Sequence, residues 1–264
     1  VGHSGNGKTA LAESLLFMTG AINRMGNSAD GNTVCDYDPE EIRRQISIST
    51  AVAPLEYKGC KINLLDTPGA FDFSGEVMEA LRAADAAIID YLMSVAMTGE
   101  GTSYADLTST VSLNEEQYGV GFRKGSDLAQ YINNVLAEAY ADGTMKEIAT
   151  TYKLQDALVE QPAAEEFTPA ADGDVAYIQD KGTLIVGITE FEPMDYKDEN
   201  GQWIGFDADL AKLVAERLGV EIQFVVIDWG QKINELDSKA IDVVWNGMTL
   251  TDGVMSAMAC TGRS

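Results

Sequence analysis

Residues 182–229 of the 264-residue chain read GTLIVGITEFEPMDYKDENGQWIGFDADLAKLVAERLGVEIQFVVIDW, and this stretch decides the fold class. Two runs rich in β-branched residues, Leu184–Ile188 and Glu221–Ile227, predict strands on either side of a helix over Phe206–Leu218. The pattern then continues to a strand over Ile241–Trp245. Strands that alternate with helices predict an α/β fold whose parallel sheet is covered by helices on both faces.

The middle of the chain carries periodic patterns of its own. Residues Tyr118–Phe122 alternate as a strand does, and Asp127–Tyr140 predicts a helix whose N-cap is Ser126. A second helix is expected from Met145 to Tyr152. The stretch Gln161–Asp174, with two prolines and four acids, is typical of a linker.

The first 87 residues also alternate between helical and extended patterns. Helices are expected over Thr9–Gly20 and Gly75–Ala84. Two strands, Ser47–Leu55 and Lys61–Leu65, are predicted to be joined by a tight turn. The apolar run Ala86–Asp90 predicts a further short, buried strand.

Charge excludes several classes of partner. With 18 basic and 42 acidic side chains, the formal net charge is −24, which repels nucleic acids and anionic membranes. The longest basic cluster is the pair Arg43 and Arg44, so no nucleic-acid partner is expected. Residues 1–87 carry a net charge of −5 and residues 88–264 one of −19, which indicates two sources of sequence. No apolar run reaches the ~18 residues of a membrane span.

Cysteine and histidine usage predicts neither a disulfide framework nor a zinc site. Cys35, Cys60 and Cys260 are an odd number and widely spaced, and His3 is the single histidine. A nucleophilic triad would have to recruit that histidine, so no catalytic residue is assigned. The chain shows no signal peptide and begins at Val1, from which we expect a processed product, a fragment or an engineered chain.

A phosphate-binding motif opens the sequence. The octapeptide GHSGNGKT that starts at Gly2 satisfies G-x-x-x-x-G-K-[ST] in full. Gly2, Gly5 and Gly7 allow backbone N–H groups to turn toward a phosphate. Lys8 supplies a positive charge, and the hydroxyl of Thr9 can ligate Mg²⁺.

A family resemblance extends this motif. The stretches GHSGNGKTALAESLLF, DYDPEEIRRQISIS and INLLDTPGAFDFSGEVMEALRAADAA closely resemble the GTPase domain of elongation factor G-like translational GTPases, over residues 1 to about 88. The resemblance implies that GTP phosphates bind at the motif, with Mg²⁺ held by Thr9, Ser47 and Asp66. Gly69 would sense the γ-phosphate.

The positions at which the sequence departs from this family are as informative as the matches. Only Val1 remains of the strand that should precede the phosphate loop, and Ala70 stands where the family carries a water-positioning histidine. The guanine-reading N-K-x-D motif is absent, because the sequence changes character after Ala87. The resemblance therefore implies weak hydrolysis or none, and leaves open whether the chain is an enzyme.

A second resemblance covers the rest of the chain. The stretch that opens this section, together with NGMTLTD at residues 246–252, resembles the first lobe of amino-acid-type solute-binding proteins of ABC importers. Residues 85–154 resemble the C-terminal part of the same family, which implies a circularly permuted order with most of the second lobe missing. The expected organisation is a truncated GTPase-like segment (1–87), a C-terminal solute-binding part (88–160), an acidic linker (161–174) and an N-terminal lobe part (175–264).

The second resemblance also implies a ligand site for a small amino-acid-like solute. Phe191 and Trp229 would stack on the apolar part of the ligand. Backbone or hydroxyl groups of Gly247 and Thr249 would bind its α-carboxylate, and Asp90 would bind its α-ammonium group. No cofactor is required for this activity, whereas GTP binding would need Mg²⁺.

Several alternatives remain open at this stage. The chain is interpreted first as a solute-binding module weakened by the loss of one lobe, second as a nucleotide-phosphate binder, and third as a folded chimera in which neither site works. Val254 replaces an arginine that relatives often carry, Trp229 has a competing interpretation as a core residue, and Asp207 and Asp209 have one as helix N-terminal acids. Localisation is undetermined, because one resemblance implies the cytoplasm and the other the cell envelope.

Overall fold

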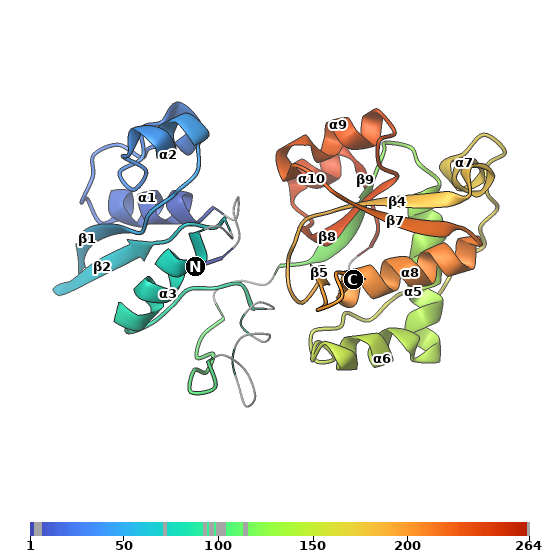
Figure 1. Cartoon of the computed structure of the whole chain (residues 1–264), viewed down its shortest axis with the longest axis horizontal. Helices are drawn as coiled ribbons and strands as arrows, with labels where there is room; N and C mark the ends of the chain where they lie inside the picture. Colours follow the sequence, from blue (N-terminus) through green and yellow to red (C-terminus); the bar gives the residue numbers. More distant parts are fainter. Residues whose placement is uncertain are drawn as a thin grey trace. The chain divides into compact units, whose positions relative to one another are not determined.

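The computed structural model divides into two compact units, Val1–Tyr91 and Leu92–Ser264, each of which is described by itself (Figure 1). The predicted boundary after Ala87 lies close to this division. The residues that the structure describes are 1–2, 7–70, 73–91, 94, 98, 104–112 and 116–262.

The unit Val1–Tyr91 is built on a β-hairpin that packs against a helix. Strands β1 (Ala51–Tyr57) and β2 (Cys60–Asp66) pair antiparallel through a two-residue turn. Both turn residues, Lys58 and Gly59, have positive φ (48° and 77°), as a turn that matches the twist of a hairpin requires. Helix α1 (Lys8–Met18) buries its apolar face on β1. The other elements of this unit are η1 (Ser28–Asp30), α2 (Pro39–Arg44) and α3 (Ser74–Ala83).

Side-chain carboxylates replace strand pairing just before β1. The predicted strand Ser47–Leu55 starts four residues late, at Ala51. The N–H groups of Ile48 and Ser49 donate to Glu41 Oε1, at 2.9 and 3.1 Å. Backbone donors that are satisfied by a carboxylate are not available to a ladder, so this stretch stays irregular.

The predicted buried strand Ala86–Asp90 is wrong. This stretch has no strand conformation, residues 85–88 are exposed, and half of the Ile88 surface faces solvent. A strand needs a neighbour that satisfies its backbone groups. In the described part of this unit, the amino group of Val1 donates to Ile88 O at 2.8 Å.

The unit Leu92–Ser264 contains a five-stranded sheet in the order β7-β4-β8-β3-β9. Strands β4 (Thr183–Ile188), β7 (Glu221–Val226) and β8 (Val243–Thr249) are parallel. Strand β3 (Tyr118–Phe122) is antiparallel to β8 and to β9 (Ala259–Cys260). Four of the five strands therefore run in one direction, so the α/β fold with a mostly parallel sheet is confirmed.

Helices cover both faces of this sheet (Figure 1). One core lies against α5 (Leu128–Asp142), α6 (Thr144–Thr151), α7 (Asp174–Lys181) and α8 (Phe206–Leu218). A second core lies under α9 (Lys232–Asp237) and α10 (Asp252–Ala257). Along β8, Val243 and Trp245 belong to the first core and Val244 and Met248 to the second, as the two-residue period of a strand dictates. The short hairpin of β5 (Tyr196–Lys197) and β6 (Trp203–Ile204) precedes α8.

The predicted linker packs against the rest of the unit Leu92–Ser264, which we call the lobe. Its Phe167 ring meets Tyr131 of α5 edge-on, with 6.0 Å between ring centroids. The Asp127 carboxylate accepts from the N–H groups of Ala170 and Val175, at 3.1 Å each. The N-cap of α5 is Asp127 and not the predicted Ser126, although Ser126 Oγ accepts from the N–H of the first helical residue. Helix α7, which begins where the linker ends, was not predicted.

Candidate functional site

The candidate solute site lies where β4 and β8 end. Phe191 follows β4, and Gly247 and Thr249 are among the last residues of β8. Because β4 and β8 are parallel, their carboxyl ends meet at one edge of the sheet, where open α/β sheets bind ligands. The structure thus brings three of the five predicted solute-site residues to the same edge.

Phe191 and Gly247 are in direct contact. A Cβ atom at Gly247 would lie 2.6 Å from Phe191 Cε1, and the φ of Gly247 is 54°, so both space and backbone conformation favour glycine. The Phe191 loop is fixed by its own backbone: Phe191 N–H donates to Asp195 O at 2.7 Å, and Asp195 N–H donates back to Phe191 O at 2.9 Å. The aromatic ring therefore packs against β8 at Gly247.

Two of the groups predicted to bind a ligand carboxylate already bind carboxylates of the chain. Gly247 N–H donates to Asp207 Oδ2 at 2.6 Å, and Thr249 Oγ1 donates to Glu116 Oε2 at 3.3 Å. Asp207 lies in the first turn of α8, where the sequence suggested that it stabilises the helix N-terminus. Its carboxylate has a second role, because it accepts the hydrogen bond from Gly247. It fixes α8 to the end of β8.

Trp229 packs mainly as a core residue. It begins η3 (Trp229–Gln231) and lies on the core that contains Leu236, on the face of the sheet opposite to the core that Phe191 contacts. Lys232 Nζ lies 4.7 Å from its ring centroid and donates to Trp229 O at 3.0 Å. A stacked pair of Phe191 and Trp229 around a ligand therefore stays a prediction, and the core interpretation gains support.

The remaining solute-site prediction, Asp90, lies in the unit Val1–Tyr91 and is half-buried there. Its proposed contact with a ligand ammonium group remains a prediction. Val254 lies in α10 and packs against the core that contains Met258, so it offers no polar group to a ligand.

A buried polar cluster lies directly under the Phe191 loop. Asn246 Nδ2 donates to Asp195 Oδ2 at 2.9 Å and to Thr189 O at 3.0 Å, and Thr189 N–H donates to Asn246 Oδ1 at 2.8 Å. Asp195 Oδ1, fully buried, has no hydrogen-bond partner in the described part of the chain. Sequence reasoning missed this cluster, although a polar residue inside the buried run VVWNGMT is a signal that could have found Asn246.

Burial governs the protonation of this cluster. Desolvation raises the pKa of Asp207 to about 7, against the opposing hydrogen bonds from Gly247 and the Trp245 side chain. Burial, followed by repulsion from Asp207, raises the pKa of Asp195 well above its usual range. Two carboxyl groups that resist ionisation thus hold the loop and the strand that form the candidate site.

The predicted magnesium ligands converge in the other unit. Thr9 Oγ1 and Ser47 Oγ lie 3.3 Å apart, and the Thr9 hydroxyl also hydrogen-bonds Asp66. Ser47 Oγ donates to Asp36 Oδ1 at 2.6 Å. Burial raises the pKa of Asp66 and lowers that of Lys8, which the Asp66 and Asp36 carboxylates raise in part. Hydroxyl and carboxylate oxygens are the ligands that Mg²⁺ prefers, so these residues fit the ion.

The backbone of the phosphate loop is described only at its ends. Gly7, with φ 72°, precedes α1 and accepts the Leu11 N–H at 2.8 Å, so the helix starts directly after the motif. Gly2 has a φ of 144°, and Gly69 is half-buried after β2. Gly5 lies outside the described residues, so the predicted cradle of N–H groups stays a prediction.

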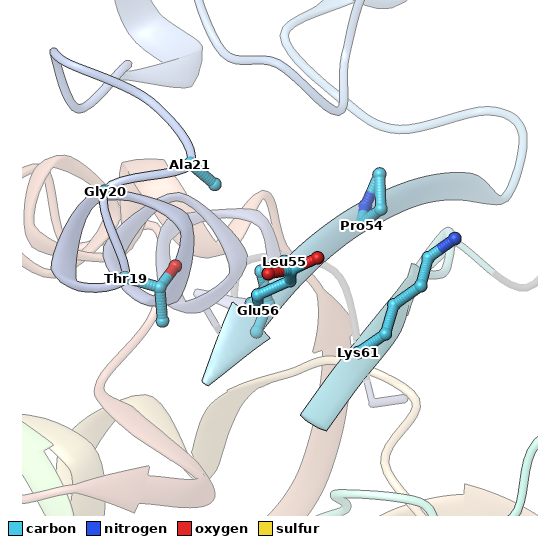
Figure 2. Close-up of a pocket in the computed structure, with 7 residues that line it drawn as sticks. All are labelled: Thr19, Gly20, Ala21, Pro54, Leu55, Glu56 and Lys61. Atoms are coloured by element: carbon cyan, nitrogen blue, oxygen red, sulfur yellow. The ribbon is translucent and has the colours of Figure 1, made fainter. Parts of the chain in front are cut away.

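A shallow hollow of about 420 Å³ lies in the same unit, between the end of α1 and the hairpin (Figure 2). None of the residues predicted to bind solute, nucleotide or metal lines it. The lining residues are Thr19, Gly20, Ala21, Pro54, Leu55, Glu56 and Lys61.

Two family profiles match two separate parts of the chain. Residues 1–104 match the elongation factor Tu GTP binding domain, and residues 184–261 match the bacterial extracellular solute-binding proteins, family 3. The chain therefore combines a segment similar to translational GTPases with a segment similar to bacterial solute-binding proteins, as the two resemblances predicted.

Individual relatives cover one segment each. An elongation factor G-like protein of Mycobacterium tuberculosis (strain ATCC 25618 / H37Rv) is 53% identical over 88 residues, which is 33% of this chain and 12% of that protein. An elongation factor G-like protein of Synechocystis is 45% identical over 89 residues, 34% of this chain and 13% of that protein. The chain thus spans about an eighth of the length of these relatives.

Solved structures resemble the other segment. The arginine-bound form of domain 1 from TmArgBP is 43% identical, over 30% of this chain and 64% of that one, with a TM-score of 0.29. An ancestral cationic amino acid solute binding protein is 40% identical, over 32% of this chain and 37% of that one, with a TM-score of 0.31.

Two further properties concern the described residues alone. No helix among them has the length and apolar character needed to cross a bilayer. The same residues contain no group of three or more His, Cys, Asp or Glu side chains arranged to hold a metal ion.

The buried acid at position 207 predicts a specific pH dependence. With a pKa of about 7 in the folded state and an ordinary value when unfolded, Asp207 keeps a proton that the unfolded chain releases. Its contribution to the free energy of unfolding therefore falls as pH rises from about 4 to about 7, by at most about 4 kcal/mol, and is constant above. Asp207→Asn keeps an acceptor for Gly247 N–H and removes this slope.

The measurement is urea unfolding at pH 4 to 8, followed by tryptophan fluorescence, because Trp203, Trp229 and Trp245 all lie in the unit Leu92–Ser264. The free-energy difference between the native protein and Asp207→Asn should change with pH in this window. Asp180→Asn, an exposed change on α7, serves as the control. A pH-independent difference for Asp207→Asn would show that this carboxyl titrates normally.

Proposed function

We propose that the unit Leu92–Ser264 binds a small amino-acid-like solute at the carboxyl edge of its sheet. The observation that carries the proposal is the Phe191 ring seated on Gly247, inside the segment that matches solute-binding family 3. An aromatic face at the carboxyl ends of parallel strands is a suitable wall for the carbon skeleton of such a solute.

Isothermal titration with free amino acids and their decarboxylated amines tests this proposal. Phe191→Ala should weaken any binding by about tenfold, which corresponds to 1.4 kcal/mol of lost contact. Phe167→Ala, which removes an aromatic ring from the linker on α5, should leave the affinity unchanged. Equal affinity of Phe191→Ala and the native protein would place the ligand elsewhere.

We propose as a second function that the unit Val1–Tyr91 binds nucleotide phosphates with Mg²⁺. The contact between Thr9 and Ser47, with Asp66 beside them, favours this candidate. Lys8 would offset phosphate charge, and the hydroxyls of Thr9 and Ser47 with the Asp66 carboxylate would hold the ion, which itself neutralises phosphate charge when bound. Ala70 carries no proton-accepting side chain, so hydrolysis of bound nucleotide would be slow.

Fluorescence titration with a mant-labelled guanine nucleotide and Mg²⁺ tests the second function. Lys8→Ala should weaken binding at least about tenfold, because the loss of a phosphate-facing charge removes a charge-assisted hydrogen bond. Lys61→Ala, an exposed change on β2, is the matched control. Binding that is equal in the two variants would exclude the phosphate loop as the site.

A further inference from the structure

The Phe191 loop, residues 189–195, is held on the sheet by the side chain of Asn246 in β8. This amide contacts both ends of the loop: its Oδ1 accepts the Thr189 N–H at 2.8 Å, and its Nδ2 donates to Asp195 Oδ2 at 2.9 Å. Backbone carbonyl groups of the loop also accept the first N–H groups of α8. Of these contacts, the one through Asp195 contains a titratable group, so it is the contact whose strength depends on pH.

Asp195 lacks the partners that an ionised carboxylate needs. Its side chain is fully buried, and Oδ1 has no hydrogen-bond partner in the described part of the chain. Asn246 Nδ2 donates to Oδ2, whereas an ionised carboxylate can accept at about four positions. A buried charge without such donors is costly, and a neutral carboxyl group costs much less. The closed loop therefore favours the protonated form of Asp195.

The charged groups around Asp195 also disfavour its ionisation. Helix α8 places three of them near it, and its own loop adds two exposed acids: Asp207, Asp209, Lys212, Glu190 and Glu192. Lys212 Nζ donates to Asp209 Oδ1 at 2.8 Å, so this base is paired with another acid, to which Tyr152 at the end of α6 also donates. Burial is the larger cause of the raised pKa of Asp195, and repulsion from Asp207 follows it, so the effect does not require Asp207 to be ionised.

We propose that Asp195 makes the Phe191 loop a pH-sensitive switch, closed on Gly247 while the carboxyl group is neutral and released to solvent when it loses its proton. In the released loop, water donates to both carboxylate oxygens, which Asn246 alone cannot do. The switch is a property of the fold and does not rest on the solute site proposed above.

The direction and slope of the response follow from two protonation equilibria. In the released loop the carboxyl group of Asp195 is exposed to water and has an ordinary pKa of about 4, whereas in the closed loop its pKa is raised. The closed loop is therefore most stable below about pH 4 and loses stability as the pH rises toward the raised pKa. Within this window, each pH unit shifts the balance about tenfold toward the released loop.

Hydrogen exchange of the full chain, followed by mass spectrometry at pH 5, 6 and 7, tests the switch without any ligand. Each exchange rate is divided by the intrinsic rate at the same pH, so that it reports the opening equilibrium. The protection of the amides in residues 189–195 should fall about tenfold per pH unit, or about a hundredfold in all. The amides of α5 should stay better protected at every pH, because their exchange requires a larger unfolding.

Asp195→Asn keeps an acceptor for Asn246 and has no charge to gain, so the protection of its loop should be nearly independent of pH. Glu192→Gln removes an exposed negative charge from the same loop and should keep the native slope. A native loop whose protection does not change with pH would overturn the inference, whatever the variants do. It would also be overturned by an undiminished slope in Asp195→Asn, or by equal protection of the loop and α5.

Discussion

The pairing of β3 between β8 and β9 is the interaction on which the lobe depends. Val120 N–H donates to Thr261 Oγ1 at 2.9 Å, and Thr261 N–H donates to Val120 O at 3.0 Å, so residues 141 positions apart in sequence close the sheet. Leu250 N–H donates to Gln117 O at 2.8 Å, beside the end of β8. Without β3, strands β8 and β9 would have no common neighbour, and Val120 and Phe122 would leave the core.

The side chain that follows β3 extends this role. Arg123 Nη1 donates to Leu236 O and Ile241 O, and Nη2 donates to Asp174 Oδ1 at 2.8 Å. It therefore joins β3 to the helix that follows the linker and to the turn before β8. A guanidinium with several fixed donors is suited to such a junction, because each buried carbonyl and carboxylate receives a partner. These contacts bring the parts before and after the linker together in one core.

Local periodicity predicted most elements of the lobe. Helix α8 has the predicted bounds, and β3, β4 and β7 were found within about one residue. The run Ala86–Asp90 was misassigned because an apolar pattern signals a strand only where a neighbouring strand exists. The antiparallel direction of β3 could not be predicted, because it depends on pairing between distant segments.

The same limit applies to the candidate site. Phe191, Gly247 and Thr249 were identified from a resemblance, and the fold gathers them at one edge. Their chemistry was not predictable, because Asp207 and Glu116, which occupy the two donors, are separated from them by 40 and 133 positions. The same holds in the unit Val1–Tyr91. The motif predicted Thr9 and the family resemblance predicted Ser47, whereas the fold brings their hydroxyls together.

The central claim, that the parts before and after the linker form one core through β3, is tested by Arg123→Met. The measurement is the free energy of unfolding in urea, from the fluorescence of the three tryptophans, all of which lie in this lobe. Loss of a buried charge partner should cost about 3 kcal/mol, whereas Arg217→Met, at an exposed pair with Glu138, should cost less than about 1 kcal/mol. A loss for Arg123→Met no larger than that of Arg217→Met would contradict the account.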